Sequence, residues 1–132
     1  MIDADRVAEL LASDQYASGL GIRLVEVGAE SISLEMAVTD SMTNFHGGLH
    51  GGVLFSLADC ALSLYSNSYG EPAVAVDTHM VFSAAVTPEE RLSAVVEELS
   101  RGRSLASYRV LVRRTDGKLA GHFTGTVFIR GS

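Results

Sequence analysis

The stretch FHGGLHGGVLFSLADCALSLYSNS, Phe45 to Ser68, decides the fold of this 132-residue chain. It begins with four glycines and two histidines and continues as an apolar run rich in Leu and Ala. From Gly51 to about Ser68 the run is too long for one strand, so it predicts a helix of about five turns. Asp59 stands in the middle of this run. An ionised carboxylate is costly there unless it has partners.

A helical wheel places the polar residues of this run on one narrow line. At about 100° per residue they share an arc of about 100°, and we call them the polar line: Gly52, Ser56, Asp59, Ser63, Ser66 and Asn67. The rest of the circumference is apolar, which is typical of a buried helix. Two structural readings of Asp59 stay open, because it could accept hydrogen bonds that hold a loop or cap a second helix. In apolar surroundings, however, a carboxylate has a raised pKa and can act as a base or nucleophile.

The glycines before the helix allow a substrate to approach its first turn. Unpaired N–H groups at a helix N-terminus suit an oxyanion, although glycine-rich turns are also common without this role. Gly51 and Asp59 are eight residues apart in the sequence, which is about 12 Å along a helix. A nucleophile and an oxyanion donor must both lie within a few ångströms of one carbonyl. We therefore expect Gly51 of one subunit to face Asp59 of another.

The remaining pattern predicts one α+β domain over residues 1–132, with a single sheet around the central helix. A short amphipathic helix is predicted over 3–12, and strands over 22–28, 31–38, 73–83, 91–99, 104–114 and 119–129. Hairpin turns are predicted at Gly28–Glu30 and at Asp116-Gly117, and a loop over 40–50. One sheet covers only one side of the helix, so we expect at least a dimer.

Composition excludes several classes of function. The net charge is −6 and the basic residues form no cluster, which disfavours nucleic acid and anionic membranes as partners. Cys60 is the only cysteine, so no intrachain disulfide is expected. We expect its thiol to be buried and the protein to be located in the reducing cytoplasm. We expect neither a secretory signal at the acidic N-terminus nor a membrane span. No spacing of His, Asp and Cys predicts a metal site.

Two motifs carry a resemblance to a known family. They are NFHGGLHGGVLFSLAD, residues 44–59, and NSYG, residues 67–70. This pattern resembles the PaaI-type hotdog-fold thioesterases of the 4-hydroxybenzoyl-CoA thioesterase superfamily. The resemblance implies a curved antiparallel sheet wrapped around one long helix, in a homodimer with a continuous sheet or a homotetramer. It also implies hydrolysis of acyl-CoA thioesters at the dimer interface, with no cofactor because CoA is part of the substrate.

The resemblance also implies roles for individual residues. Asp59 would be the catalytic carboxylate, as general base or nucleophile, and Gly51 would donate its backbone N–H to the thioester oxygen. Asn44, from the same subunit as Gly51, would orient the carbonyl or the attacking water. Ser63 matches a hydroxyl position that helps to place water, and Gly52 is assigned to substrate binding.

Further assignments concern His50 and the turn after the fourth strand. His50 matches the family histidine, and a structural role in bonding the loop backbone is favoured over acid–base chemistry. Arg101, Gly102 and Arg103 are assigned to CoA phosphate or pantetheine, with a solvated surface arginine as the equal alternative. The family's Phe-x-Arg-Pro turn is replaced here by FSAA, residues 82–85, so the CoA or oligomer contact of that arginine is not carried over to this sequence.

The acyl group is expected to be aryl or medium-chain. Five apolar residues could line its pocket or belong to the core, the core being favoured: Phe45, Leu54, Phe55, Tyr65 and Met80. The other histidines are weaker candidates for the site. His46 is expected either to line the pocket mouth or to be an exposed loop residue. His79 and His122 are expected to be structural. Two other functions stay open, a non-catalytic acyl-CoA-binding module and a hydratase or dehydratase on the same fold.

Overall fold

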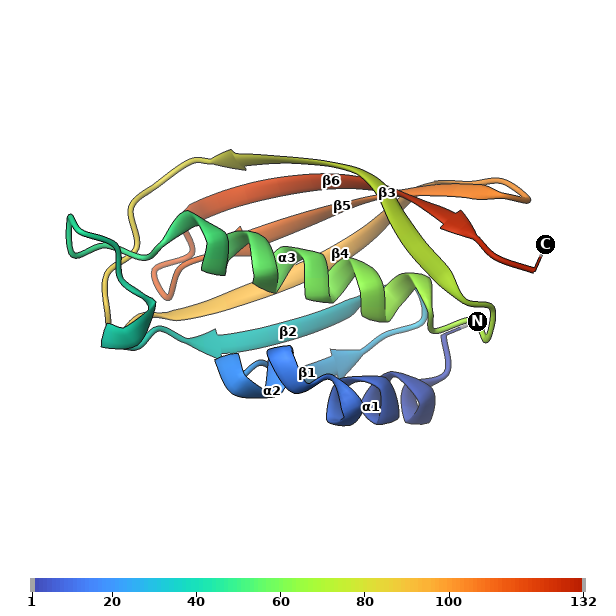
Figure 1. The fold of residues 1–132 in the computed structure, drawn as a ribbon, viewed down its shortest axis with the longest axis horizontal. Helices are drawn as coiled ribbons and strands as arrows, with labels where there is room; N and C mark the ends of the chain where they lie inside the picture. Colours follow the sequence, from blue (N-terminus) through green and yellow to red (C-terminus); the bar gives the residue numbers. More distant parts are fainter. Residues whose placement is uncertain (1, 132) are drawn as a thin grey trace.

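The central helix α3 (Gly51–Ser66) lies across the concave face of a curved antiparallel sheet (Figure 1). The structure is a computed structural model that describes residues 2–131. Two shorter helices, α1 (Ala4–Ser13) and α2 (Gln15–Leu20), lie beside α3 on the same side of the sheet. No helix among the described residues has the length and hydropathy to span a membrane.

The sheet has the order β1-β2-β4-β5-β6-β3, and every neighbouring pair is antiparallel. Its strands are β1 (Arg23–Val27), β2 (Ile32–Ala37), β3 (Ala73–Phe82), β4 (Arg91–Arg101), β5 (Leu105–Arg113) and β6 (Leu119–Ile129). The expected architecture of a curved antiparallel sheet around one long helix is therefore confirmed. The largest differences from the predicted bounds are two residues, because β4 continues to Arg101 and α3 ends at Ser66, while the other ends differ by at most one residue.

The prediction of one short N-terminal helix was incomplete, because α2 follows α1 directly. The Asp14 side chain starts α2 by accepting a hydrogen bond from the Ala17 N–H at 3.0 Å. Gly21, with φ of 74°, ends it in the left-handed conformation. Ala17 is the one buried residue of this six-residue helix, so the segment carries no apolar periodicity that would have revealed it.

The hydrophobic core lies between α3 and the inner faces of the strands. The buried residues of α3 are Leu54, Leu57, Ala58, Cys60, Ala61, Leu62, Leu64, Tyr65 and Ser66. β6 comes very close to its neighbours at Gly121. A Cβ atom there would lie 2.8 Å from Met80 Cε, 2.9 Å from the Val81 carbonyl oxygen and 3.1 Å from Leu54 Cδ2. The close fit of β6 against both β3 and α3 thus depends on the missing side chain.

The end of α3 is tied to the start of β3 by Asn67. Its Nδ2 donates to the carbonyl oxygens of Ser63 at 2.9 Å and Ala73 at 3.1 Å. Its Oδ1 accepts from the Ala73 N–H at 2.9 Å. Ser66, next to Asn67, is buried. These two members of the polar line therefore have a structural role at the helix end.

The other members of the polar line face away from the sheet. Gly52 and Ser63 are exposed, while Ser56 and Asp59 are half-buried. Strand β3 forms one edge of the sheet and hydrogen-bonds only to β6 among the described strands. Its apolar side chains are well exposed, Val76 at 59% and Phe82 at 56%. An unpaired edge of this length is a template for pairing with another chain.

Gly121→Ala tests the close packing of β6 and should lower the free energy of unfolding by about 1–3 kcal/mol, the usual cost of overpacking. The Val81 carbonyl belongs to the backbone and cannot move aside as a side chain could. Urea denaturation followed by circular dichroism measures the change. Gly19→Ala is the control, because a Cβ there meets nothing within 4 Å and alanine favours a helix. Equal stability of the two variants would contradict the packing.

Candidate active site

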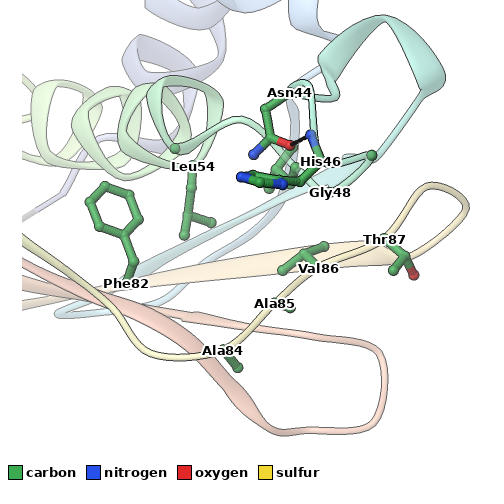
Figure 2. A pocket seen from close by; sticks show the side chains of 12 residues that line it. Asn44, His46, Gly48, Leu54, Phe82, Ala84, Ala85, Val86 and Thr87 are labelled. Carbon is green, nitrogen blue, oxygen red and sulfur yellow. Dashed lines mark hydrogen bonds between the residues drawn. The ribbon is translucent and has the colours of Figure 1, made fainter.

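A cavity of about 410 Å³ lies between the loop that precedes α3 and the segment that follows β3 (Figure 2). Its lining residues are Asn44, His46, Gly47, Gly48, Leu49, Gly51, Leu54, Phe82, Ala84, Ala85, Val86 and Thr87. The Leu49 N–H joins the two walls by donating to the Val86 carbonyl at 2.8 Å. Arg114 supports the outer wall through an Nη1 bond to the Ala85 carbonyl at 2.9 Å. The segment FSAA, which replaces the family turn, thus forms a wall of this cavity.

Asn44 is held by a tight turn that directs its amide into the cavity. Its backbone N–H donates to the Gly48 carbonyl at 2.8 Å, and its carbonyl accepts from the Gly47 N–H at 3.0 Å. Its Oδ1 accepts from the backbone N–H of His46 at 2.8 Å. The Nδ2 group donates to no described residue and points into the cavity (Figure 2). Asn44 therefore offers a fixed hydrogen-bond donor to a ligand.

Gly51, the first residue of α3, lines the same cavity. Its backbone N–H precedes the intrahelical hydrogen bonds, and no group within residues 2–131 accepts from it. A Cβ atom at this position would lie 3.2 Å from the Phe82 ring, so glycine keeps the approach open. The amide lies at the positive end of the helix dipole and can stabilise a developing negative charge.

His50 and Gly52 bond to each other at the helix start. The Gly52 N–H donates to His50 Nδ1 at 2.9 Å, so His50 is the N-cap of α3. His50 thus bonds to the backbone at the start of the helix. The Gly52 amide is occupied by the cap, which leaves Gly51 as the free donor next to the cavity.

Asp59 lies in a second, smaller depression between α2 and α3, of about 100 Å³. The residues that line it are Asp14, Tyr16, Ala17, Ile22, Phe55, Ser56, Asp59, Cys60 and Ser63. Ser63 shares the depression, one turn after Asp59 on α3. The cavity with Asn44 and Gly51 and the depression with Asp59 and Ser63 are therefore separate within one chain.

The carboxylate of Asp59 has no partner that would explain it as a structural group. None of residues 2–131 donates a hydrogen bond to it or forms an ion pair with it. It does not cap a second helix either, because α3 is continuous from Gly51 to Ser66. Both structural readings of this residue are thus wrong for the chain as folded here.

The surroundings of Asp59 favour its protonated form. Burial raises the pKa of Asp59 above its ordinary value of 3.8, and the negative charge of Asp14 raises it further. A carboxylate with a raised pKa is a stronger base once ionised. Cys60, the next residue, is buried, and desolvation together with both carboxylates raises the pKa of its thiol to about 12. The thiol is therefore no nucleophile at neutral pH.

Arg101, Gly102 and Arg103 lie at the β4–β5 turn, at the opposite end of the sheet from the loop that precedes α3 (Figure 1). Arg101 is already engaged, by Glu98 at 3.0 Å, by the Tyr108 hydroxyl at 2.9 Å and by the Tyr69 ring at 4.2 Å. The Gly102 N–H donates to the Leu105 carbonyl at 2.7 Å. Arg103 is exposed and bonds to no described residue, so it is the free cation of this group.

Several residues differ from their expected environments. Phe45 is 93% exposed and lies outside both the core and the cavity, which corrects the expectation that it belonged to one of them. His46 lines the cavity, and its imidazole points inward (Figure 2). Asp14 and Tyr16 in the depression had no sequence signal, because α2 itself was not predicted.

Comparison of the chain with known proteins finds thioesterases among those similar to it. The family model of the thioesterase superfamily matches residues 46–120. The chain is 42% identical to a Deinococcus radiodurans protein described as an esterase, over 85% of this chain and 77% of that protein. It is 31% identical to the acyl-coenzyme A thioesterase PaaI of Escherichia coli, over 86% of this chain and 81% of that protein. A solved structure of E. coli PaaI superposes with a TM-score of 0.93 at 28% identity, covering 97% of this chain and 93% of that one.

The Asp14→Asn variant should lower the pKa of Asp59, because it removes the neighbouring negative charge. Asparagine can still cap α2, so the local fold is retained. Titration of the Asp59 carboxyl carbon by NMR measures the change. Asp40→Asn, at the distant turn η1 (Asp40–Met42), is the control and should leave the midpoint unchanged. An Asp59 midpoint that is the same in both variants would show that Asp14 has no electrostatic effect.

Proposed function

Because the chain belongs to the thioesterase superfamily as a PaaI-like hotdog thioesterase, we propose that it hydrolyses acyl-CoA thioesters at a site shared between two subunits. The observation that carries this proposal is that two polar groups of α3 have no hydrogen-bond or ion-pair partner. Gly51 and Asp59 each line an open depression, and neither the Gly51 amide nor the Asp59 carboxylate has a partner among the described residues. One group suits a thioester oxygen and the other an attacking water.

The separation of these groups supports a dimer. Gly51 and Asp59 are eight residues apart on one continuous helix, or about 12 Å, so one chain cannot bring both to one carbonyl carbon. A two-fold axis beside the uncovered side of α3 would place the helices antiparallel, with Gly51 of each chain near Asp59 of the other. The exposed edge of β3 supports the same arrangement, because two such edges can pair into a continuous sheet.

In the proposed reaction the thioester carbonyl lies between the two helices. The Gly51 N–H and the Asn44 Nδ2 of one subunit bind and orient the carbonyl oxygen. Asp59 of the other subunit takes a proton from water as the water attacks, and the exposed Ser63 hydroxyl helps to place that water. The alternative is direct attack by Asp59, which would form an anhydride that water then hydrolyses.

The relatives support acyl-CoA as the substrate. The E. coli relative is named an acyl-coenzyme A thioesterase, and we assign the same substrate class here, with an aryl or medium-chain acyl group. In the antiparallel dimer the β4–β5 turn of the partner lies toward the Gly51 end of the first subunit. Arg103, the free cation of that turn, is then the residue placed to meet a CoA phosphate.

The Asp59→Asn variant should reduce thiol release from acyl-CoA by at least about 100-fold, because the base is lost while the shape is kept. Release of CoA thiol is measured on a panel of aryl, short and medium acyl-CoAs, with Asn44→Ala as a second site variant. Circular dichroism verifies that each variant is folded. Undiminished turnover in Asp59→Asn would remove this mechanism, and binding of acyl-CoA without thiol release by the wild-type protein would favour a non-catalytic module.

A further inference from the structure

His46 is the only ionisable side chain among the residues that line the larger cavity. Its imidazole points into the cavity (Figure 2), and its backbone N–H is bonded to the side chain of Asn44. No ring nitrogen of His46 bonds to a described residue. His50, by contrast, uses its Nδ1 to cap α3 and does not line the cavity. The two histidines that the sequence places four residues apart thus have different surroundings, and only His46 is free to meet a ligand there.

The position of His46 is tied to that of the group that would hold the carbonyl. Asn44 Oδ1 accepts the backbone N–H of His46 at 2.8 Å, so the same side chain that offers Nδ2 to the substrate also fixes the histidine. The imidazole packs against Phe45, with ring centroids 4.4 Å apart. Phe45 is 93% exposed and His46 is exposed as well, so the histidine lies at the open mouth of the cavity.

Thioester hydrolysis includes a second proton transfer, to the departing sulfur, for which the mechanism above names no donor. When the tetrahedral intermediate collapses, the carbon–sulfur bond breaks and its electron pair passes to the sulfur of the leaving group. An alkyl thiolate leaves slowly compared with a more acidic thiol, so a proton donor near the sulfur accelerates this step. The sulfur is bonded directly to the carbonyl carbon and therefore lies within the same cavity as the Asn44 and Gly51 donors.

We propose that His46 is the general acid of the reaction and donates its ring proton to the departing sulfur. This inference rests on the proposed function. The imidazolium N–H proton passes to sulfur and forms the S–H bond of the free thiol as the carbon–sulfur bond breaks. The proton that Asp59 takes from water passes to solvent, and the neutral imidazole takes up a proton from solvent, so hydrolysis yields one acid and one thiol. No acidic residue of the same subunit is among the described residues that line the cavity, so the carboxylate of the proposed site is Asp59 of the other subunit.

The test is the His46→Gln variant on three thioesters of one acyl group, the one that the wild-type protein hydrolyses fastest. Glutamine keeps the backbone N–H that Asn44 accepts, so the turn is preserved. The thioesters are the acyl-CoA, the acyl-N-acetylcysteamine and the acyl-thiophenol. The first two have alkyl thiol leaving groups, and the second lacks the phosphates of CoA. The third thioester releases thiophenolate, which leaves readily without protonation because an aryl thiol is more acidic than an alkyl thiol.

A general acid predicts a loss of kcat of about 100-fold on both alkyl thioesters and little loss on the thiophenyl ester. Loss on the acyl-CoA alone would instead make His46 a phosphate contact and overturn the proposal. Equal loss on all three would make its role structural, and no loss on any would leave it without a role. His122→Gln, in β6 opposite Leu111 and Val81, is the matched control and should behave as wild type.

The same assays separate this inference from the proposed function. If the wild-type protein releases thiol and Asp59→Asn does not, the proposed function stands whatever the His46 result is. If the wild-type protein releases no thiol from any of the three esters, the proposed function fails and the His46 inference fails with it.

Discussion

The distance that a rigid helix imposes between Gly51 and Asp59 is the constraint on which the rest of this structure depends. Helix α3 is continuous from Gly51 to Ser66, so no side-chain rotation can bring the amide and the carboxylate to one reacting carbon. If both groups act on one carbon, they must come from two chains, as in the shared site proposed above. Three otherwise unrelated features fit this constraint: the two separate depressions, the uncovered side of α3 and the long exposed edge of β3.

This arrangement has an energetic consequence for the single chain. Because the pKa of Asp59 is raised on folding, its ionised form is less stable in the folded chain than in the unfolded one. The resulting loss of stability is present above the folded-state pKa and disappears as the pH falls below the ordinary value of an Asp carboxyl. The donors at the start of a partner's α3 would offset part of that loss. Asp14 adds to it, since a second carboxylate lines the same depression. The same surroundings that lower the folding stability of the chain therefore make the ionised Asp59 carboxylate a stronger base. Such a cost in stability is common where function needs an unfavourable group.

The larger elements could be predicted from the sequence because their signals are local. The apolar run of α3 and the alternating pattern of the strands predicted their positions, and β6 was predicted from 119 to 129, as found. The polar line predicted Asp59 on the uncovered side of the helix. The eight-residue spacing from Gly51 predicted that the two residues would lie apart. These inferences needed only helix geometry and the cost of burying a charge.

What the sequence could not predict depends on tertiary contacts. Helix α2 depends on the Asp14 cap and the left-handed Gly21 more than on any apolar pattern. Arg101 is drawn into a cluster with Glu98, Tyr108 and Tyr69, which sequence spacing cannot reveal. His46 and His50 have similar neighbours in the sequence. Their surroundings differ because of tertiary structure. The turn at Asn44 directs the His46 ring into the cavity, whereas the His50 ring caps the start of α3.

The most direct test of the shared site is complementation between two inactive variants. Asn44→Ala and Asp59→Asn chains are unfolded together, refolded as a mixture and assayed for thiol release from acyl-CoA. In a mixed dimer, one site combines the intact Asn44 of one chain with the intact Asp59 of the other. Random pairing then predicts recovery to about a quarter of the wild-type activity, since half of the dimers are mixed and each has one intact site. No recovery from a mixture shown to contain mixed dimers would mean that both residues act within one chain, which would contradict this account.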